Sequence, residues 1–319
     1  MSENIQPYAL VFGASIFDIC GFTDSDYRCN DSNPGKINTS LGGVCRNIAE
    51  CMARVGVNTK FISILGNDET GKRIMEHSKM MNYDMSESLI IEGGNTPTYM
   101  AILDENGEMV SAVVDMKIMD IFTTDFIDEK AEIIKNSEYL ILGADRPDIV
   151  EHITKTFKDD TKLILDPVSA AKAKKVKHII QNFHTIKPNR YEAEIMCGFK
   201  IISDYDLRKA GKYFIDLGIK NVFITLDEDG IYYNNGSQEG KIKANDVNVV
   251  NVTGAGDSFV AGIMRGYMNN TDLVNTVKYA IAMSTITIST KEVIHPDMSH
   301  DLVEEYMNKI NWTEEIYKK

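Results

Sequence analysis

Short apolar runs alternate with segments of helical spacing along most of the chain. The runs are YALVFGA, TKFISILG, EYLILGA, TKLILDPVSA, HTIKPN and KNVFITL. Between most of them lie segments such as NIAECMARVG and ETGKRIMEHSKMMN, whose apolar residues recur at helical spacing. This alternation predicts an α/β fold with a mostly parallel central sheet that is flanked by helices.

Two regions interrupt this alternation. Residues 14–40 have little helical pattern and include the turn-rich NDSNPGK, and residues 95–117 read as two strands with a turn around Asn106 and Gly107. A hairpin of this kind needs another surface to cover its apolar face. We expect both segments to build a small β-lid over an α/β core made of residues 1–13, 41–94 and 118–319.

The last third of the chain predicts three helices. DSFVAGIMRGYMNN and TDLVNTVKYAIAMSTITIST have the pattern of consecutive helices, and Thr271 and Asp272 start the second. SHDLVEEYMNKINW is expected to be a surface helix that is followed by a frayed tail.

Composition excludes several classes of protein. A formal net charge of -13 argues against a nucleic-acid backbone or an anionic membrane as the main partner. The N-terminus shows no basic region before a long apolar segment, and no stretch approaches the ~20 apolar residues of a membrane span. We therefore expect a cytoplasmic protein without a signal peptide. The five cysteines form no CxxC pair, which favours free thiols over a zinc site or a disulfide framework.

Polar residues stand where three of the predicted strands end. Asp166, Asn189 and Thr225 lie at or just past strand ends. Ligands of open α/β sheets bind outside the carboxyl ends of the strands, so these residues mark the expected active edge.

The segment VVNVTGAGDSFVAG places two glycines and a carboxylate at the start of a predicted helix. Gly254 and Gly256 would let backbone N–H groups approach a ligand, and the helix beginning near Asp257 adds its positive dipole end. Asp257 could then accept a proton from a substrate hydroxyl during phosphoryl transfer. A glycine-rich turn with Asp257 as a helix cap remains the alternative.

Two further segments carry candidate chemistry. SLGGVCRNIAE places Gly42, Gly43 and Asn47 at the start of a helix, which suits close approach to a ligand or a plain loop before an amphipathic helix. In TIKPNRYEAE, Asn189 and Glu192 share one face of an opening helical turn. Their oxygens suit hydrated magnesium, and a capping box explains the same spacing.

Taken together and in this order, these segments resemble the ribokinase family of sugar and nucleoside kinases, also called the PfkB family. The resemblance covers essentially the whole chain: Asp18 after the first strand, GG-x-x-x-N, N-x-x-E, the TL turn after KNVFI, and T-G-A-G-D near the end. It implies a ribokinase-like fold and an ATP-dependent phosphotransferase that acts on an alcohol group with the help of Mg²⁺.

The resemblance also implies a role for each matching residue. Asp257 would be the catalytic base, and the backbone of Gly254, Ala255 and Gly256 would form the anion hole. Glu192, through water, and Asn189 would organise magnesium and the phosphates. The remaining roles would be sugar binding by Asp18, Gly43 and Asn47, a border to the nucleotide formed by Thr225 and Gly230, and backbone oxygens for K⁺ from Asn251 and Thr253.

Within this family, NDSNPGK, GGVCRNIAE, VDMKI, LDPVSA, HTIKPNRYEAE and NVTGAGD are most similar to the pseudouridine kinases. The chain departs from the commoner ribokinase pattern at Asn251, Arg46 and Val44. Ile16 replaces a sugar-binding Asn, and Asp227 replaces a Gly of the TLG turn, so sugar and nucleotide contacts would differ there. Arg46 could bind a phosphate or a base carbonyl, or be an ion-paired helix residue. Thr98 could face the substrate from the lid.

The similarity to pseudouridine kinases implies phosphorylation of the 5′-hydroxyl of pseudouridine. A kinase for another nucleoside, ribose or a fructose-type sugar is the first alternative, and a sensing protein without catalysis is the second. Asp257, Asn189 and Glu192 together argue against a pure binder, which needs no base. A lid made of strands offers an edge through which two copies could form a homodimer.

Overall fold

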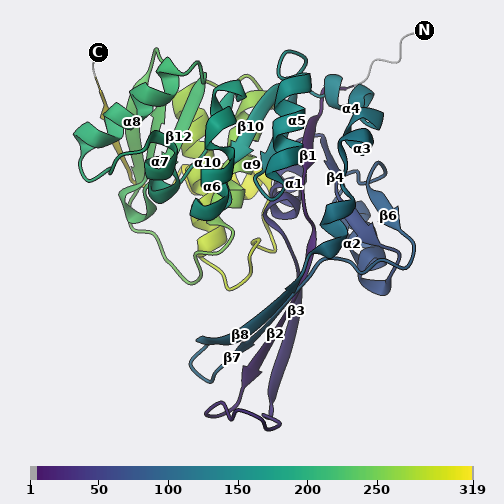
Figure 1. Cartoon of the computed structure of the whole chain (residues 1–319). Helices are drawn as coiled ribbons and strands as arrows, with labels where there is room; N and C mark the ends of the chain where they lie inside the picture. Colours follow the sequence, from purple (N-terminus) through teal and green to yellow (C-terminus); the bar gives the residue numbers. More distant parts are fainter. Residues whose placement is uncertain (1–5, 318–319) are drawn as a thin grey trace.

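A nine-stranded sheet lies at the centre of the molecule, and the computed structural model describes residues 6–317 (Figure 1). The strands from β4 to β12 are parallel, and those from β13 to β15 are antiparallel. This confirms the predicted mostly parallel sheet. In spatial order the strands are β15 (Trp312–Ile316), β14 (Glu239–Ala244), β13 (Ile231–Asn234), β12 (Asn221–Thr225), β11 (Thr185–Ile186), β10 (Lys162–Asp166), β9 (Tyr139–Gly143), β1 (Ala9–Phe12) and β4 (Thr59–Ile62).

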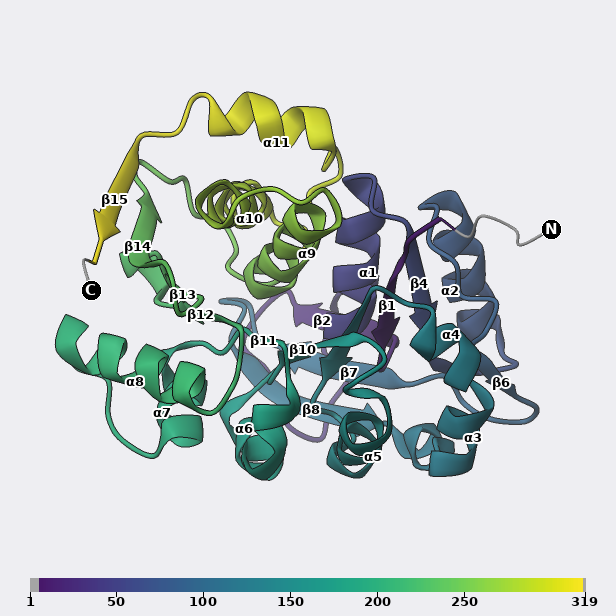
Figure 2. The same cartoon turned by 90° about the horizontal axis from the view of Figure 1, so that it is seen from above.

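Helices cover both faces of this sheet (Figure 2). Every residue of β1 and β9 is buried, as expected for continuous apolar strands between two helical layers. On one side lie α1 (Val44–Arg54), α2 (Glu69–Met80), α9 (Ala255–Met268), α10 (Leu273–Ile288) and α11 (His300–Met307). On the other lie α3 (Thr124–Glu129), α4 (Ala131–Lys135), α5 (Pro147–Phe157), α6 (Ala170–Val176), α7 (Arg190–Cys197) and α8 (Asp204–Asp216).

A four-stranded sheet projects from the carboxyl ends of the central strands (Figure 1). Its order is β3-β2-β7-β8, and its two middle strands are parallel, with Phe17 opposite Thr98. We call it the projecting sheet. Its strands are β2 (Ile16–Thr23), β3 (Gly35–Gly42), β7 (Thr98–Leu103) and β8 (Met109–Asp115).

The remaining elements are short. β5 (Ile64–Gly66) and β6 (Leu89–Ile91) form a two-stranded parallel sheet. Three 3₁₀ helices complete the described chain: η1 (Lys117–Ile121), η2 (Lys177–Asn182) and η3 (Asp227–Asp229). Within residues 6–317, no helix has the length and apolar character that crossing a membrane requires.

The structure corrects the expectation for the C-terminal segment. The helix is present as α11, but the residues after it form β15 instead of a frayed tail. β15 pairs antiparallel with β14, and Trp312 packs against the apolar cluster between β14 and α10. Backbone pairing and burial of the indole together order this segment. The run TKFISILG, expected as one strand, divides at Ser63 into β4 and β5.

Candidate functional site

The turn at the start of α9, residues 254–256, combines glycines with a helix N-terminus, as the predicted anion hole requires, and we call it the anion turn. Gly254 caps the helix with a φ of 83°, and a Cβ at this position would overlap the carbonyl oxygen of Val293. Only glycine fits such a position. α9 begins at Ala255, close to the start near Asp257 that the sequence predicted. The first N–H groups of a helix have no intrahelical acceptor, and their dipole favours negative charge.

Asp257 lies in the first turn of α9 with its carboxyl group buried. Asn47 of α1 donates a hydrogen bond from Nδ2 to Oδ2 of Asp257, at 2.8 Å. Burial raises the pKa of Asp257 to about 6, with a further increase from Asp166, while Asn47, Lys187 and Arg46 oppose it. A carboxylate with this pKa is ionised at neutral pH and is basic enough to accept a proton.

A buried ion pair adjoins the same turn. Lys187 follows β11, and its Nζ lies 2.9 Å from Oδ2 of Asp166 at the end of β10. The same nitrogen lies 2.9 Å from the point that a Cβ on Gly256 would occupy. Burial lowers the pKa of Lys187, but the charges of Asp166, Glu192 and Asp257 together raise it by more than that. The net change is an increase, so the ammonium stays charged. Asp166 was predicted at this edge from the sequence, whereas no role was predicted for Lys187.

Asp18 and the start of α1 converge with Asp257. Gly42 packs so closely on Asp18 that a Cβ there would overlap the carboxylate. Burial raises the pKa of Asp18, and the charge of Arg46 opposes that change. Gly43 caps α1 and accepts a hydrogen bond from the N–H of Asn47, at 2.9 Å. Asp18 and Arg46 therefore lie beside the carboxylate–amide pair of Asp257 and Asn47.

Arg46 is an ion-paired helix residue in this structure. Its side chain is buried, and Nη1 lies 2.5 Å from Oε2 of Glu50. Nη2 donates to Oδ1 of Asn47 at 2.6 Å, while Nε has no partner among the described residues. Two nitrogens of the guanidinium are thus already bonded, one to Glu50 and the other to Asn47, whose amide contacts Asp257.

Thr98 starts β7, in the strand beside Asp18. It pairs with Phe17 of β2 and with Asp115 of β8. Its hydroxyl donates to the backbone oxygen of Thr96, at 3.0 Å. The projecting sheet therefore brings Thr98 to the same end of the molecule as Asp18.

A second group of predicted residues lies at the ends of β11 and β12. Asn189 and Thr225 form a parallel bridge. Beyond Thr225, Gly230 has a φ of 90°, and its carbonyl accepts the N–H of Leu226 at 2.9 Å. These residues thus border one edge of the site, on the far side of Lys187 from Asp18.

The capping box at Asn189 and Glu192 is present. Asn189 Oδ1 accepts the N–H of Glu192 at 2.9 Å, and Glu192 Oε2 accepts the N–H of Asn189 at 2.8 Å. Burial raises the pKa of Glu192, with a further increase from Asp166 that Lys187 opposes. The buried carboxylates of Glu192 and Asp166 thus repel each other, and a divalent cation bound near both would relieve this repulsion.

The donors at this edge fit magnesium better than a tightly caged metal. In the part of the chain that the structure describes, no three His, Cys, Asp or Glu side chains gather at metal-binding distances. Mg²⁺ commonly keeps several waters and binds through one or two carboxylates together with substrate phosphates. Glu192 and Asp166 supply oxygen donors of that kind.

The loop before the anion turn is held against the end of α10. The N–H of Asn251 donates to the backbone oxygen of Ile288 at 3.2 Å, and its Nδ2 donates to that of Lys291 at 3.0 Å. Asn251 Oδ1 accepts the N–H of Thr253, also at 3.0 Å. These bonds fix the backbone on which the predicted monovalent-cation oxygens lie.

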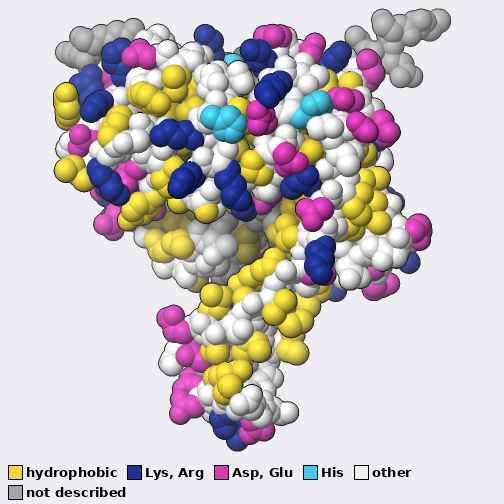
Figure 3. Space-filling view, in the orientation of Figure 1, with side chains coloured by type: hydrophobic (Ala, Val, Ile, Leu, Met, Phe, Trp, Pro, Cys, Tyr) yellow, Lys and Arg dark blue, Asp and Glu magenta, His cyan; other side chains and the backbone are white. Residues whose placement is uncertain are grey.

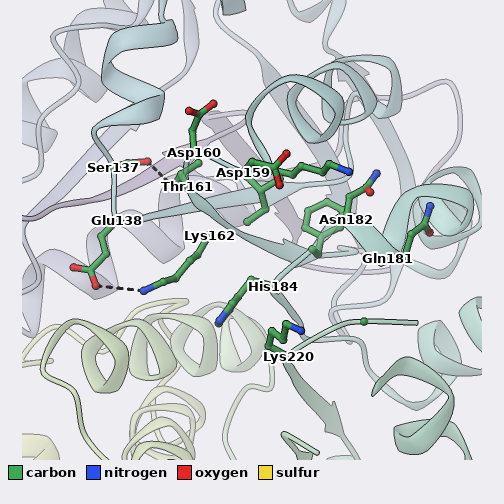
Figure 4. A pocket seen from close by; sticks show the side chains of 14 residues that line it. Ser137, Glu138, Asp159, Asp160, Thr161, Lys162, Gln181, Asn182, His184 and Lys220 are labelled. Carbon is green, nitrogen blue, oxygen red and sulfur yellow. Dashed lines mark hydrogen bonds and ion pairs between the residues drawn. The ribbon is translucent and has the colours of Figure 1, made fainter. Parts of the chain in front are cut away.

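A cavity lies at the opposite edge of the sheet (Figure 4). It has a volume of about 610 Å³ and lies at the amino ends of β9 to β12. Its ionisable groups are solvent-accessible side chains such as Glu138, Lys162 and Lys220. None of the residues that converge on Asp257 lines this cavity, so it is separate from the candidate site.

Comparison with known proteins identifies the family. Residues 6–300 match the model of the pfkB family of carbohydrate kinases. The chain is 31% identical over 298 residues to the pseudouridine kinase of Escherichia coli, covering 92% of this chain and 94% of that protein.

Solved structures agree with this assignment. A proposed sugar kinase from Clostridium perfringens is 60% identical, with a TM-score of 0.95, and the match covers 99% of this chain and 100% of that one. The ribokinase of Arabidopsis thaliana, solved with ribose and ATP, shares the fold at 19% identity and a TM-score of 0.83, over 95% and 99% of the two chains. The chain therefore belongs to the pfkB family of carbohydrate kinases and has its ribokinase-like fold.

Proposed function

We propose that the protein transfers the terminal phosphoryl group of ATP to the 5′-hydroxyl of pseudouridine. The observation that carries this proposal is the meeting of three groups at one turn: the buried carboxylate of Asp257, the backbone N–H groups at the start of α9, and the ammonium of Lys187. The similarity to a pseudouridine kinase across nearly the whole chain supports the choice of acceptor.

Asp257 would act as the base. Asn47 donates to one oxygen of its carboxylate, at 2.8 Å, which leaves the other oxygen free to accept the proton of the acceptor hydroxyl. Asp18, Asn47 and the backbone of Gly43 would hold the sugar hydroxyls, with Thr98 approaching from the projecting sheet. Holding the hydroxyl in line with the phosphoryl group supplies much of the rate enhancement in such reactions.

The anion turn would stabilise the negative charge of the phosphoryl group during its transfer. The N–H groups of Gly254, Ala255 and Gly256 and the ammonium of Lys187 face the position of the transferred phosphoryl group in this proposal. Groups fixed in place before the reaction stabilise developing charge without reorganisation. Asn189, Thr225 and Gly230 would border the nucleotide, and Glu192 would hold Mg²⁺ through water, which neutralises phosphate charge when bound.

Substrate choice is tested with a coupled ADP-release assay. Pseudouridine, uridine, ribose and fructose are compared at matched concentrations, and Asp257→Asn is assayed beside them to subtract contaminating kinases. The highest kcat/KM is expected for pseudouridine, with a 5′-phosphomonoester as product by ³¹P NMR. A higher kcat/KM for ribose or uridine would replace the proposed acceptor. Tight binding without ADP production would instead identify a sensing protein.

We also propose that K⁺ binds the backbone oxygens of Asn251 and Thr253. The hydrogen bonds that fix this loop against Ile288 and Lys291 support a preformed site beside the anion turn. Titration with KCl at constant ionic strength is expected to raise kcat. A flat rate would remove this part of the proposal.

The projecting sheet is proposed to pair with a second copy of the chain. Hydrophobic side chains run along it in Figure 3, and exposed fractions reach 75% for Ile37, 68% for Val113 and 62% for Met109. Exposed apolar surface on a sheet with open edges favours association. Val113→Lys is expected to give a monomer in analytical ultracentrifugation, whereas Ile202→Lys, an exposed position outside this sheet, leaves the dimer.

ATP as substrate implies a cytoplasmic location, and the net charge of -13 disfavours nucleic acid as a partner.

A further inference from the structure

A row of three charged side chains lies along α1, the helix whose Asn47 contacts Asp257. Arg46, Glu50 and Arg54 are spaced four residues apart and lie on one face of the helix. Glu50 Oε2 contacts Nη1 of Arg46 at 2.5 Å, and Oε1 contacts Nη2 of Arg54 at 2.7 Å. The side chains of Arg46 and Glu50 are each only 4% exposed.

Such an arrangement is costly as a stabilising device alone. Moving an ion pair out of water costs several kcal/mol for each ion, and apolar residues of similar volume are often as stable. Arg46 Nε also has no partner within residues 6–317, which adds to the cost. The position of the pair indicates a role in the site, because Arg46 also contacts Asn47, the residue that donates a hydrogen bond to Asp257.

Arg46 determines which way the amide of Asn47 faces. Nη2 of Arg46 donates to Oδ1 of Asn47 at 2.6 Å, while Nδ2 of Asn47 donates to Asp257 at 2.8 Å. A guanidinium can only donate, so it selects the amide oxygen. If the amide were reversed, its NH₂ would face the guanidinium and its oxygen would face the carboxylate, and both contacts would be repulsive.

We propose that Arg46 and Glu50 are positioning residues, which hold the amide of Asn47 so that it donates to Asp257 and favours the ionised base. Glu50 acts through Arg46: its carboxylate neutralises the guanidinium and anchors Nη1, which leaves Nη2 directed at Asn47. The inference rests on the proposed role of Asp257 as the base.

Other charged groups face Asp257 and remain in place when this row is altered. Asp166 comes from β10 and raises the pKa of Asp257, and Lys187, after β11, lowers it. The buried thiols of Cys45 and Cys51 on α1 also lie close, and burial raises the pKa of each. Near Glu50, His77 Nδ1 lies at 3.7 Å, and burial lowers the pKa of His77.

The test uses Arg46→Gln, Glu50→Gln and the double variant, with Asp216→Asn as control. Lys212 and Asp216 form another four-residue-spaced ion pair, on the surface of α8. Arg46→Gln is expected to lower kcat roughly tenfold at pH 7 and to move the acid limb of kcat/KM upward by about one pH unit. Glu50→Gln should lower kcat by a similar factor alone and add nothing in the double variant. Asp216→Asn should change neither quantity.

A readout that does not need turnover accompanies the kinetics. The carboxyl ¹³C signal of Asp257, assigned by its loss in Asp257→Asn, is titrated in the wild type and in Arg46→Gln. A higher pKa in the variant is expected. This result stands even if Asp257→Asn keeps turnover, so failure of the base assignment and failure of the positioning inference are distinguishable.

Two outcomes would overturn the inference. One is a raised KM for the acceptor in Arg46→Gln with the acid limb and the ¹³C titration unchanged, which would make Arg46 a direct substrate contact. The other is additive losses from Arg46→Gln and Glu50→Gln. If Arg46→Gln does not fold, Arg46→Lys carries the same readouts, because lysine keeps the charge but cannot contact Glu50 and Asn47 with separate nitrogens.

Discussion

The two edges of the central sheet differ in whether their charged side chains are exposed or buried. At the amino edge, a cavity of about 610 Å³ is lined by Lys162, Glu138 and other side chains that reach water. At the carboxyl edge, Asp257, Lys187 and Asp166 are buried; Lys187 pairs with Asp166, and Asp257 accepts a hydrogen bond from Asn47. Buried charges that face one point are costly to maintain, so they mark a site more reliably than open volume does.

The largest expected effect is from Asp257→Asn. The amide cannot accept the hydroxyl proton, so kcat should fall by about 10²–10⁴-fold. The fold should persist, because Asn47 can still donate to an oxygen at this position. Steady-state kinetics and thermal unfolding measure the two effects. Asp160→Asn, beside the amino-edge cavity, is the matched control, and comparable losses in both variants would erase the distinction between the edges.

Lys187→Met should have the next largest effect. It removes the cation beside the anion turn, and loss of one charge-stabilising group costs about 10²–10³-fold in kcat. It also leaves Asp166 buried without its partner, which destabilises the fold by about 3–5 kcal/mol. Lys187→Arg, which keeps the charge, should lose less activity. If purified Lys187→Met folds and turns over like the wild type, the lysine has no part in transfer.

The pH dependence of kcat/KM should report Asp257. Because the pKa of this buried carboxyl is raised to about 6, activity should fall about tenfold for each pH unit below that value. The stability effect has the opposite direction. The folded protein binds this proton more tightly than the unfolded chain, so the contribution of Asp257 to stability decreases as pH rises from about 4 to about 6. Denaturant unfolding at several pH values, with Asp257→Asn as reference, isolates that contribution.

The smallest effect is expected at the amino edge. Lys162 lies 3.6 Å from Glu138 and over the ring of Tyr139, so Lys162→Met should change stability by about 1 kcal/mol or less. Its kcat should stay within about twofold of the wild type. This is the same substitution as at Lys187, so the contrast in rate between the two variants measures the difference between the edges. A large loss at Lys162 would give the cavity a role in catalysis.

The sequence predicts the parallel strands well because their apolar runs are continuous and separated by amphipathic helices. β9 and β10 are examples, and Asp166 was correctly placed at a strand end. β15 was missed because its sequence, WTEEI, is rich in charge, and its pairing with β14 depends on residues some 70 positions away.

The site was only partly predictable. The glycines of the anion turn and Asn47 lie in segments with a recognisable spacing. Lys187 has no such signal, because a single lysine before a proline is common, and only its distance from Gly256 distinguishes it. The charges of Arg46 and Glu50 did have a signal, since four-residue spacing on a helix with several apolar positions suggests a buried pair. What the spacing did not give was the contact of Arg46 with the Asn47 amide.

The parallel pairing of β2 with β7 has a consequence for the order of folding. It joins Phe17 to Thr98, and the chain between them contributes β4 and two helices of the core. Closing so long a loop is entropically unfavourable until that intervening chain has collapsed. The two central strands of the projecting sheet therefore meet late during refolding, after the core has brought their ends together, and Thr98 reaches Asp18 only at that stage.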